Sequence, residues 1–258
     1  MTVLPSRFIA LAILLVFAAG ARADVRTLNL DFGNAGAYVG GGGVLSSPGG
    51  AHWNEITVTS FPPSSGIGIQ FHVPILLDEF GQSFNLPDLF PGYSFPDLSH
   101  NFQQGYETTS LGLGPLNDGV HLEASLLGFL IRELSTTTPI DLVVYFNNPN
   151  PLQPEQSTIH VNPFGGGAFP ASTTGPPTGL FPGLEGRDYL RFTGLTAYPT
   201  TIGEPPLPGI NIAVVPGVAN IAAIQIRGEF VRTPEPGVMA MVAVAAISVC
   251  ALRRFRRR

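Results

Sequence analysis

Glycine and proline interrupt this chain at short intervals, and this feature restricts it to short elements. There are 31 glycines and 25 prolines in 258 residues, and both residue types weaken or break the interiors of helices and sheets. Between them lie short runs in which apolar and polar residues alternate with a period of two, as in strands with one buried face. The sequence therefore predicts an all-β fold, a jelly roll or a related sandwich of two sheets.

The clearest alternating run is Thr27 to Phe32, in which Leu28, Leu30 and Phe32 face one way and polar residues the other. About eight strands are expected in all. The others are Glu55 to Ser60, Ile67 to Val73, Ile140 to Phe146, Thr158 to Val161, Tyr189 to Thr193, Ile210 to Val215 and Ala222 to Val231. The segment Leu122 to Leu134 fits both a helical stripe and an alternating strand, with the strand favoured. Trp53, the only tryptophan, is expected in the core.

The end of the chain has three parts in a fixed order. The triplet Pro234, Glu235 and Pro236 precedes an uncharged apolar run from Gly237 to Leu252, and an arginine-rich block follows. At ~1.5 Å per residue the run forms a helix of roughly 24 Å, which spans a bilayer when flanking arginines snorkel. Short arginine-rich flanks stay cytoplasmic, so the preceding domain is expected outside the inner membrane. The tail arginines are Arg253, Arg254, Arg256, Arg257 and Arg258.

These three parts resemble the PEP-CTERM sorting signal, over residues 233–258. In that family the membrane protease-transpeptidase exosortase recognises the triplet, cuts near it and delivers the protein to the surface of exopolysaccharide-producing Gram-negative bacteria. The resemblance implies that Pro234, Glu235 and Pro236 are recognition residues and that exosortase is a partner. The alternative is a plain C-terminal anchor that is never cut, in which the prolines only stop a strand and start a helix.

The N-terminus has the elements of a secretory signal peptide. Arg7 precedes an apolar run from Phe8 to Gly20, and the small residues Ala21 and Ala23 occupy the positions that signal peptidase reads. We expect cleavage after Ala23, which leaves residues 24–232 as the exported sandwich domain. A first transmembrane helix is the weaker alternative, because the apolar run is short and polar residues follow it.

The exported domain is acidic. Residues 24–232 contain six arginines, no lysine and 17 acidic residues, which gives a formal charge of −11. Nucleic acid is not an expected partner, because phosphate binding requires clustered cations. The only cysteine, Cys250, lies in the C-terminal apolar run, so the domain has no disulfide, catalytic thiol or cysteine-ligated metal.

A second resemblance concerns the exported domain. Its framework segments are similar, in type and order, to those of PEP-CTERM ectodomains with a galactose-binding-like sandwich: Leu28 to Gly33, the glycine-rich stretch to Gly43, Trp53-Asn54, Asp141 to Tyr145, Tyr189 to Leu195 and Ile221 to Ile226. The resemblance implies that fold and a structural or carbohydrate-associated role in the envelope or exopolysaccharide matrix. Two long insertions, Leu86 to Tyr106 and Pro163 to Gly186, depart from the pattern, so no sugar site is carried over.

The first insertion contains the candidate ligand contacts. It alternates aromatic rings with carboxylates, and flat rings beside planar acceptors suit a saccharide. The candidate contacts are Asp88, Tyr93, Phe95 and Asp97, and exopolysaccharide is the ligand class that they suit. The favoured alternative is that the rings only pack a proline-rich loop against the edge of the fold.

The sequence carries no strong enzyme signature. None of its five histidines has a spacing such as H-E-x-x-H, and there is no G-x-S-x-G motif. Acidic pairs such as Asp78 with Glu79, or Glu123 with Glu133, keep a polysaccharide hydrolase or lyase open as the alternative function. No cofactor is expected, although a calcium site using Asp31 and backbone carbonyls stays open without a D-x-D-x-D-G loop. We therefore expect a non-enzymatic protein that is anchored in the membrane before processing and then reaches the outer surface or matrix.

Overall fold

The computed structural model describes residues 25–34, 36, 38–60, 69–72, 75–84, 98–100, 105–109, 114–116, 118–147, 156–162, 169–199 and 208–231. Three sets of expected functional residues lie outside these ranges. They are the signal-peptide positions Ala21 and Ala23, the sorting segment 233–258, and the candidate saccharide contacts Asp88, Tyr93, Phe95 and Asp97. No helix within the described ranges is both long and apolar enough to cross a bilayer.

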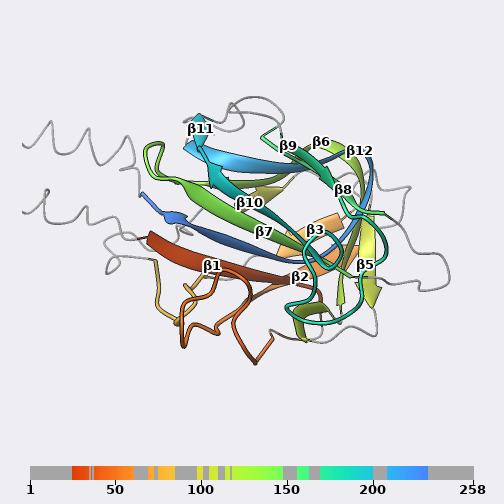
Figure 1. Ribbon diagram of the computed structural model, residues 1–258, viewed down its shortest axis with the longest axis horizontal. Helices are drawn as coiled ribbons and strands as arrows, with labels where there is room; N and C mark the ends of the chain where they lie inside the picture. The colour runs from red at the N-terminus through yellow and green to blue at the C-terminus, as the bar shows by residue number, and fades with distance from the viewer. Residues whose placement is uncertain are drawn as a thin grey trace, which may run out of the picture.

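The described part of the chain is built of strands and one short 3-10 turn, η2 (Gly114–Leu116), so the expected all-β class is confirmed (Figure 1). The strands are β1 (Val25–Phe32), β2 (Asn54–Ser60), β3 (Ile69–His72), β4 (Leu98–His100), β5 (Gly105–Thr109), β6 (Asp118–Arg132), β7 (Ile140–Phe146), β8 (Thr158–Val161), β9 (Phe169–Ser172), β10 (Tyr189–Leu195), β11 (Tyr198–Pro199) and β12 (Pro208–Glu229). Every expected strand overlaps a strand of the structure, two of them the same strand β12, and the ambiguous segment lies mostly in the long strand β6. Four strands were not anticipated: β4, β5, β9 and β11.

Strand β12 organises the fold because its two ends pair with different sets of strands. Its residues 221–229 pair with β1 and β7, and its residues 208–221 pair with β6, β8 and β11. The main strand order is β10-β7-β12-β1-β2-β3, in which only the β1–β2 pair is parallel. Two strands were expected in this region, and the structure instead has one. Its register with β6 shifts between Val214 and Val218, where Pro216 lacks an amide donor and Gly217 permits a bend.

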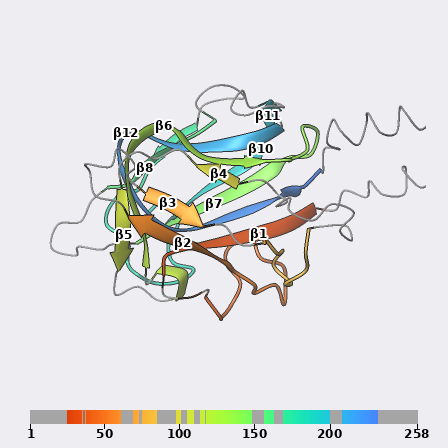
Figure 2. The same cartoon turned by 180° about the vertical axis from the view of Figure 1, so that it is seen from behind.

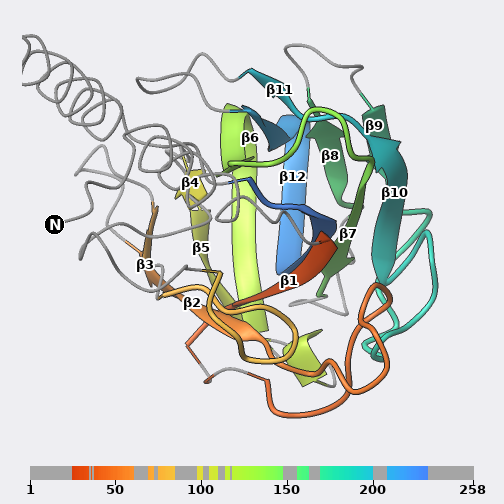
Figure 3. The ribbon, with the colours of Figure 1, turned by 90° about the vertical axis from the view of Figure 1, so that its left-hand side faces the viewer.

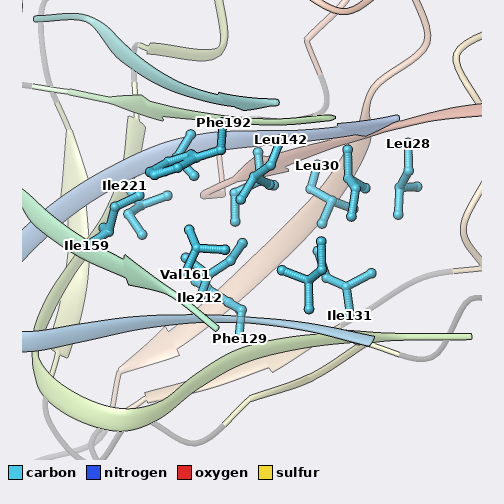
Figure 4. Packing of buried hydrophobic residues seen from close by; sticks show 14 of the residues in the cluster. Leu28, Leu30, Phe129, Ile131, Leu142, Ile159, Val161, Phe192, Ile212 and Ile221 are labelled. Atoms are coloured by element: carbon cyan, nitrogen blue, oxygen red, sulfur yellow. The ribbon is translucent and has the colours of Figure 1, made fainter. Parts of the chain in front are cut away.

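The core lies between two layers of strands. Apolar residues of β1, β7 and β10 point toward those of β6 and β8, with β12 contributing to both sides (Figure 4). Across this core the rings of Phe32 and Phe129 lie 4.9 Å apart. From behind, β2, β3 and β5 are seen on the same side of the molecule (Figure 2). The alternation of Leu28, Leu30 and Phe32 thus places one face of β1 in the core, as the sequence predicts.

The opposite face of β1 is also buried, which the alternation alone does not predict. Thr27, Asn29 and Asp31 are buried although they point away from the main core. A second apolar cluster lies on this outer face, with Trp53 and Tyr145 at its centre. The described residues of the segment 33–53, named here the cover loop, run across it beside residues 173–188 (Figure 3). This covered outer face contains the candidate site.

Candidate functional site

A buried glutamine fastens the cover loop to the sheet. The Gln225 side chain on β12 is fully buried. Its Oε1 accepts from the Tyr145 hydroxyl (2.6 Å) and the Leu45 amide (3.1 Å). Its Nε2 donates to Asn29 Oδ1 (2.8 Å) and Ser46 Oγ (3.1 Å). One side chain therefore joins β1, β7, β12 and the cover loop.

The cover loop approaches the sheet so closely at Gly43 that only glycine fits there. A Cβ at Gly43 would lie 2.3 Å from Gln225 Oε1 and 2.6 Å from the Tyr145 hydroxyl oxygen. Burial raises the pKa of Tyr145 further above its usual value, so the group stays a hydroxyl. It donates to Gln225 and accepts from the Val44 amide at 2.8 Å. The Gly-rich stretch is thus a close-packed segment at Gly43.

Five rings from four parts of the chain meet over this face, and we call them the aromatic cluster: Tyr38, Trp53, Tyr145, Phe181 and Tyr189. Their centroids are 5.4 Å apart for Tyr38–Phe181, 5.8 Å for Trp53–Phe181, 5.5 Å for Tyr145–Phe181, 6.1 Å for Trp53–Tyr145, 6.3 Å for Tyr38–Trp53 and 5.7 Å for Tyr145–Tyr189. These separations are those of favourable edge-to-face and tilted pairs. Trp53 is 1% exposed, which confirms its expected core position, whereas Tyr38, Phe181 and Tyr189 are only half-buried.

A buried aspartate shapes residues 173–188, which carry Phe181. Asp188 accepts from the amides of Thr178, Gly179 (3.2 Å) and Leu184 (2.8 Å), and from the Thr178 hydroxyl. Several donors on one carboxylate offset the cost of burying it. Phe181 therefore stands on a loop with a fixed shape, and its neighbour Leu180 is exposed. A half-buried ring on such a loop can present its face to the C–H groups of a ligand.

Two buried carboxylates, named here the acid pair, lie at the end of β1 next to the cover loop. Asp31 is 3% exposed and Asp118 is 4% exposed. Asp31 Oδ2 accepts from the Tyr38 amide at 2.9 Å, and its Oδ1 has no hydrogen-bond partner among the described residues. Burial raises the pKa of Asp31 to about 8; the Tyr38 amide opposes this, and the carboxylates of Asp118 and Glu55 add to it.

The first of the two acidic pairs considered from the sequence, Asp78 with Glu79, has structural partners. Asp78 accepts from the amides of Phe80 (3.0 Å) and Gln82 (2.8 Å) and lies 3.5 Å from Arg26. Glu79 accepts from the amide of Ser47 at 2.6 Å and from its hydroxyl at 2.9 Å. Both carboxylates thus hold turns and loops in place. Glu133 is fully buried, and the side chain of Glu123 is outside the described part.

The described histidines are part of no group of three possible metal ligands. His121 bonds Asn220 through Nδ1 at 2.7 Å inside the sheet. Within the described ranges no three His, Cys, Asp or Glu side chains converge on one point.

Sequence reasoning missed Tyr38, Phe181 and Asp118. Phe181 lies in the second expected insertion, whereas the candidate ligand contacts come from the first. Tyr38 follows a glycine-rich stretch that gives no periodic signal. No protein-family model matches the chain, and no curated protein or solved structure is significantly similar to it.

Proposed function

We propose that this chain is an exported surface protein of a Gram-negative bacterium that exosortase sorts to the envelope or the exopolysaccharide matrix. The observation that carries the proposal is the order of parts at the C-terminus: Pro234-Glu235-Pro236, an apolar run and an arginine tail. A signal peptide cut by signal peptidase after Ala23 supports the same route. Before processing, the chain is held in the inner membrane by residues 237–252.

The sorting step is tested by changing the triplet to alanines in cells that contain exosortase. A triplet variant should accumulate as an uncut, membrane-bound precursor, whereas the native chain is shortened and leaves the inner membrane. As the matched control, Pro205 and Pro206, which precede β12, are changed to alanine together. Normal processing of the triplet variant would show that the segment is a plain anchor.

For the exported domain we propose a galactose-binding-like or jelly-roll sandwich with a structural or carbohydrate-associated role and no catalytic activity. The two layers of strands with a core between them support the sandwich. The half-buried rings of Tyr38, Phe181 and Tyr189 support saccharide contact, because sugar C–H faces stack on aromatic rings. Asp88, Tyr93, Phe95 and Asp97 in the first insertion remain proposed contacts as well.

A polysaccharide hydrolase or lyase on the same scaffold is the second candidate. Glycoside cleavage needs two carboxylates that reach the substrate from opposite sides. Asp31 and Asp118 are two neighbouring carboxylates, and Asp31 has the raised pKa of a general acid. Their burial argues against this role, because a polysaccharide cannot reach side chains that are 3% and 4% exposed.

One experiment separates these functions. The purified protein is incubated with a panel of bacterial exopolysaccharides, and both binding and chain length are measured. Binding without shortening is expected, and shortened chains would favour the hydrolase or lyase. Phe181→Ala should weaken binding at least tenfold, while Phe80→Ala, a control at a ring that is 54% exposed elsewhere, should not. Loss of binding in Tyr93→Ala with Phe95→Ala, but not in Phe181→Ala, would move the contact surface to the first insertion.

A further inference from the structure

The two oxygens of the buried Asp31 carboxyl group differ in their hydrogen bonding. Its Oδ2 is held by the Tyr38 amide, but Oδ1 is buried and has no partner among the described residues. Among the described residues no arginine forms an ion pair with Asp31. A buried carboxylate without a cation is costly, and proteins resolve this by protonation or by a bound metal ion.

A second carboxylate stands beside it. Asp31 is paired with Ala223 across the sheet, and Gly119, next to Asp118, packs against the adjoining Ala222. The Asp118 carboxylate also covers Gly33, where an added Cβ would lie 2.0 Å from Oδ2. Gly33 is two residues beyond Asp31, or about 7 Å along a strand. The acid pair therefore shares one small region between β1, β12 and the start of β6.

Glu55 adds a third negative charge close to the acid pair. Glu55 is the register neighbour of Asp31 on β2, in the parallel pair, and it is half-buried. Its charge and that of Asp118 both act on Asp31. Carboxylate oxygens with no nitrogen or sulfur donor favour a hard cation, and Ca²⁺ tolerates the irregular geometry that such a region provides better than Mg²⁺ does.

We propose that Asp31 Oδ1 and the Asp118 carboxylate bind a calcium ion at the end of β1. Ca²⁺ takes six to eight oxygens, so backbone carbonyls and water complete the shell. Two side-chain ligands make the site weak, with a dissociation constant of ~10⁻⁴–10⁻³ M, the range of extracellular calcium modules. The ion compensates the buried charge and fixes Asp31, which in turn holds the Tyr38 amide of the cover loop. This inference does not depend on the proposed function.

The test uses the full chain in detergent. Calcium is titrated by calorimetry, and terbium luminescence sensitised by aromatic residues reports a lanthanide at the same site. One site with the stated affinity is expected, together with a calcium-dependent rise in Tm. Asp31→Asn and Asp118→Asn should each weaken binding at least tenfold. The control Asp141→Asn, at a half-buried aspartate on β7 that accepts from the Gly194 amide, should bind calcium as the native chain does.

Folding is checked separately in EDTA, where Asp31→Asn should melt no lower than the native chain because it removes the cost of burying an ionisable carboxyl group. Magnesium in place of calcium should bind at least tenfold more weakly. The proposal is overturned if the native chain shows neither heat nor a Tm shift up to about 10 mM calcium, well above the expected affinity. It is equally overturned if the folded Asp31→Asn variant binds calcium as tightly as the native chain.

Discussion

Replacing Gln225 with leucine should remove the fastening between the cover loop and the sheet while keeping the size of the side chain. Gln225 makes four hydrogen bonds, to Tyr145, Leu45, Asn29 and Ser46. Ser46 Oγ keeps its bond from the Gly43 amide. Three groups lose their partner: the Leu45 amide, Asn29 Oδ1 and the proton of the Tyr145 hydroxyl.

Each buried group left without a partner costs about 1–3 kcal/mol, and the added apolar contact of leucine recovers about 1 kcal/mol. We therefore expect Gln225→Leu to lower the free energy of unfolding by about 2–8 kcal/mol. Urea unfolding followed by circular dichroism measures this difference. The matched control is Arg227→Leu, two residues along the same strand at an exposed position, and it should change stability by less than about 0.5 kcal/mol.

The loss should also be local. Hydrogen exchange of the amides of residues 43–47 should rise more than that of β7, because the broken bonds connect loop to sheet. A loss below about 1 kcal/mol, or one equal to that of Arg227→Leu, would refute the view that Gln225 carries the attachment.

Three further perturbations test other parts of the site. Gly33→Ala should cost about 2–4 kcal/mol in thermal melts, because Gly33 has φ +147° and an added Cβ would collide with Asp118. The control Gly36→Ala, at φ +93° with no atom near the added Cβ, should cost about 1 kcal/mol. Asp188→Ala should cost about 2–4 kcal/mol and make residues 173–188 more susceptible to protease than in the native chain. With calcium chelated, stability should fall by a few kcal/mol as pH rises from about 4 to about 8, because folded Asp31 holds its proton up to about pH 8, and Asp31→Asn should flatten that slope.

Strand positions were predictable because they depend on local alternation and on breakers. β7 and β8 begin and end where the sequence predicts. Where the prediction failed, a long-range pairing overrode a local signal: β12 continues through Pro216 and Gly217 because β6 bends with it and keeps pairing on both sides of the shift. β4, β9 and β11 were missed because short edge strands acquire their conformation from a neighbour.

The site was much less predictable, because its contacts join distant segments. Tyr38 and Phe181 meet across more than 140 residues of sequence, and neither lies in a periodic run. Asn29 and Asp31 looked like the solvent face of a strand, but both are buried and both contact the cover loop. A polar face of a strand followed directly by a glycine-rich loop is the one signal that could have indicated this burial, since glycine permits close backbone approach.

Tyr38 connects the two proposed sites, and this connection has a thermodynamic consequence. Its amide holds Asp31 in the acid pair, and its ring contacts Phe181 in the aromatic cluster at 5.4 Å. If calcium fixes Tyr38, then a saccharide on the cluster binds a loop that is already ordered, and both ligands gain from each other by the same factor. Calcium should therefore change the affinity for saccharide by the same factor by which saccharide changes the affinity for calcium. Equal affinities in both arms, with both ligands bound, would show that the cover loop is already rigid and that the two sites act independently.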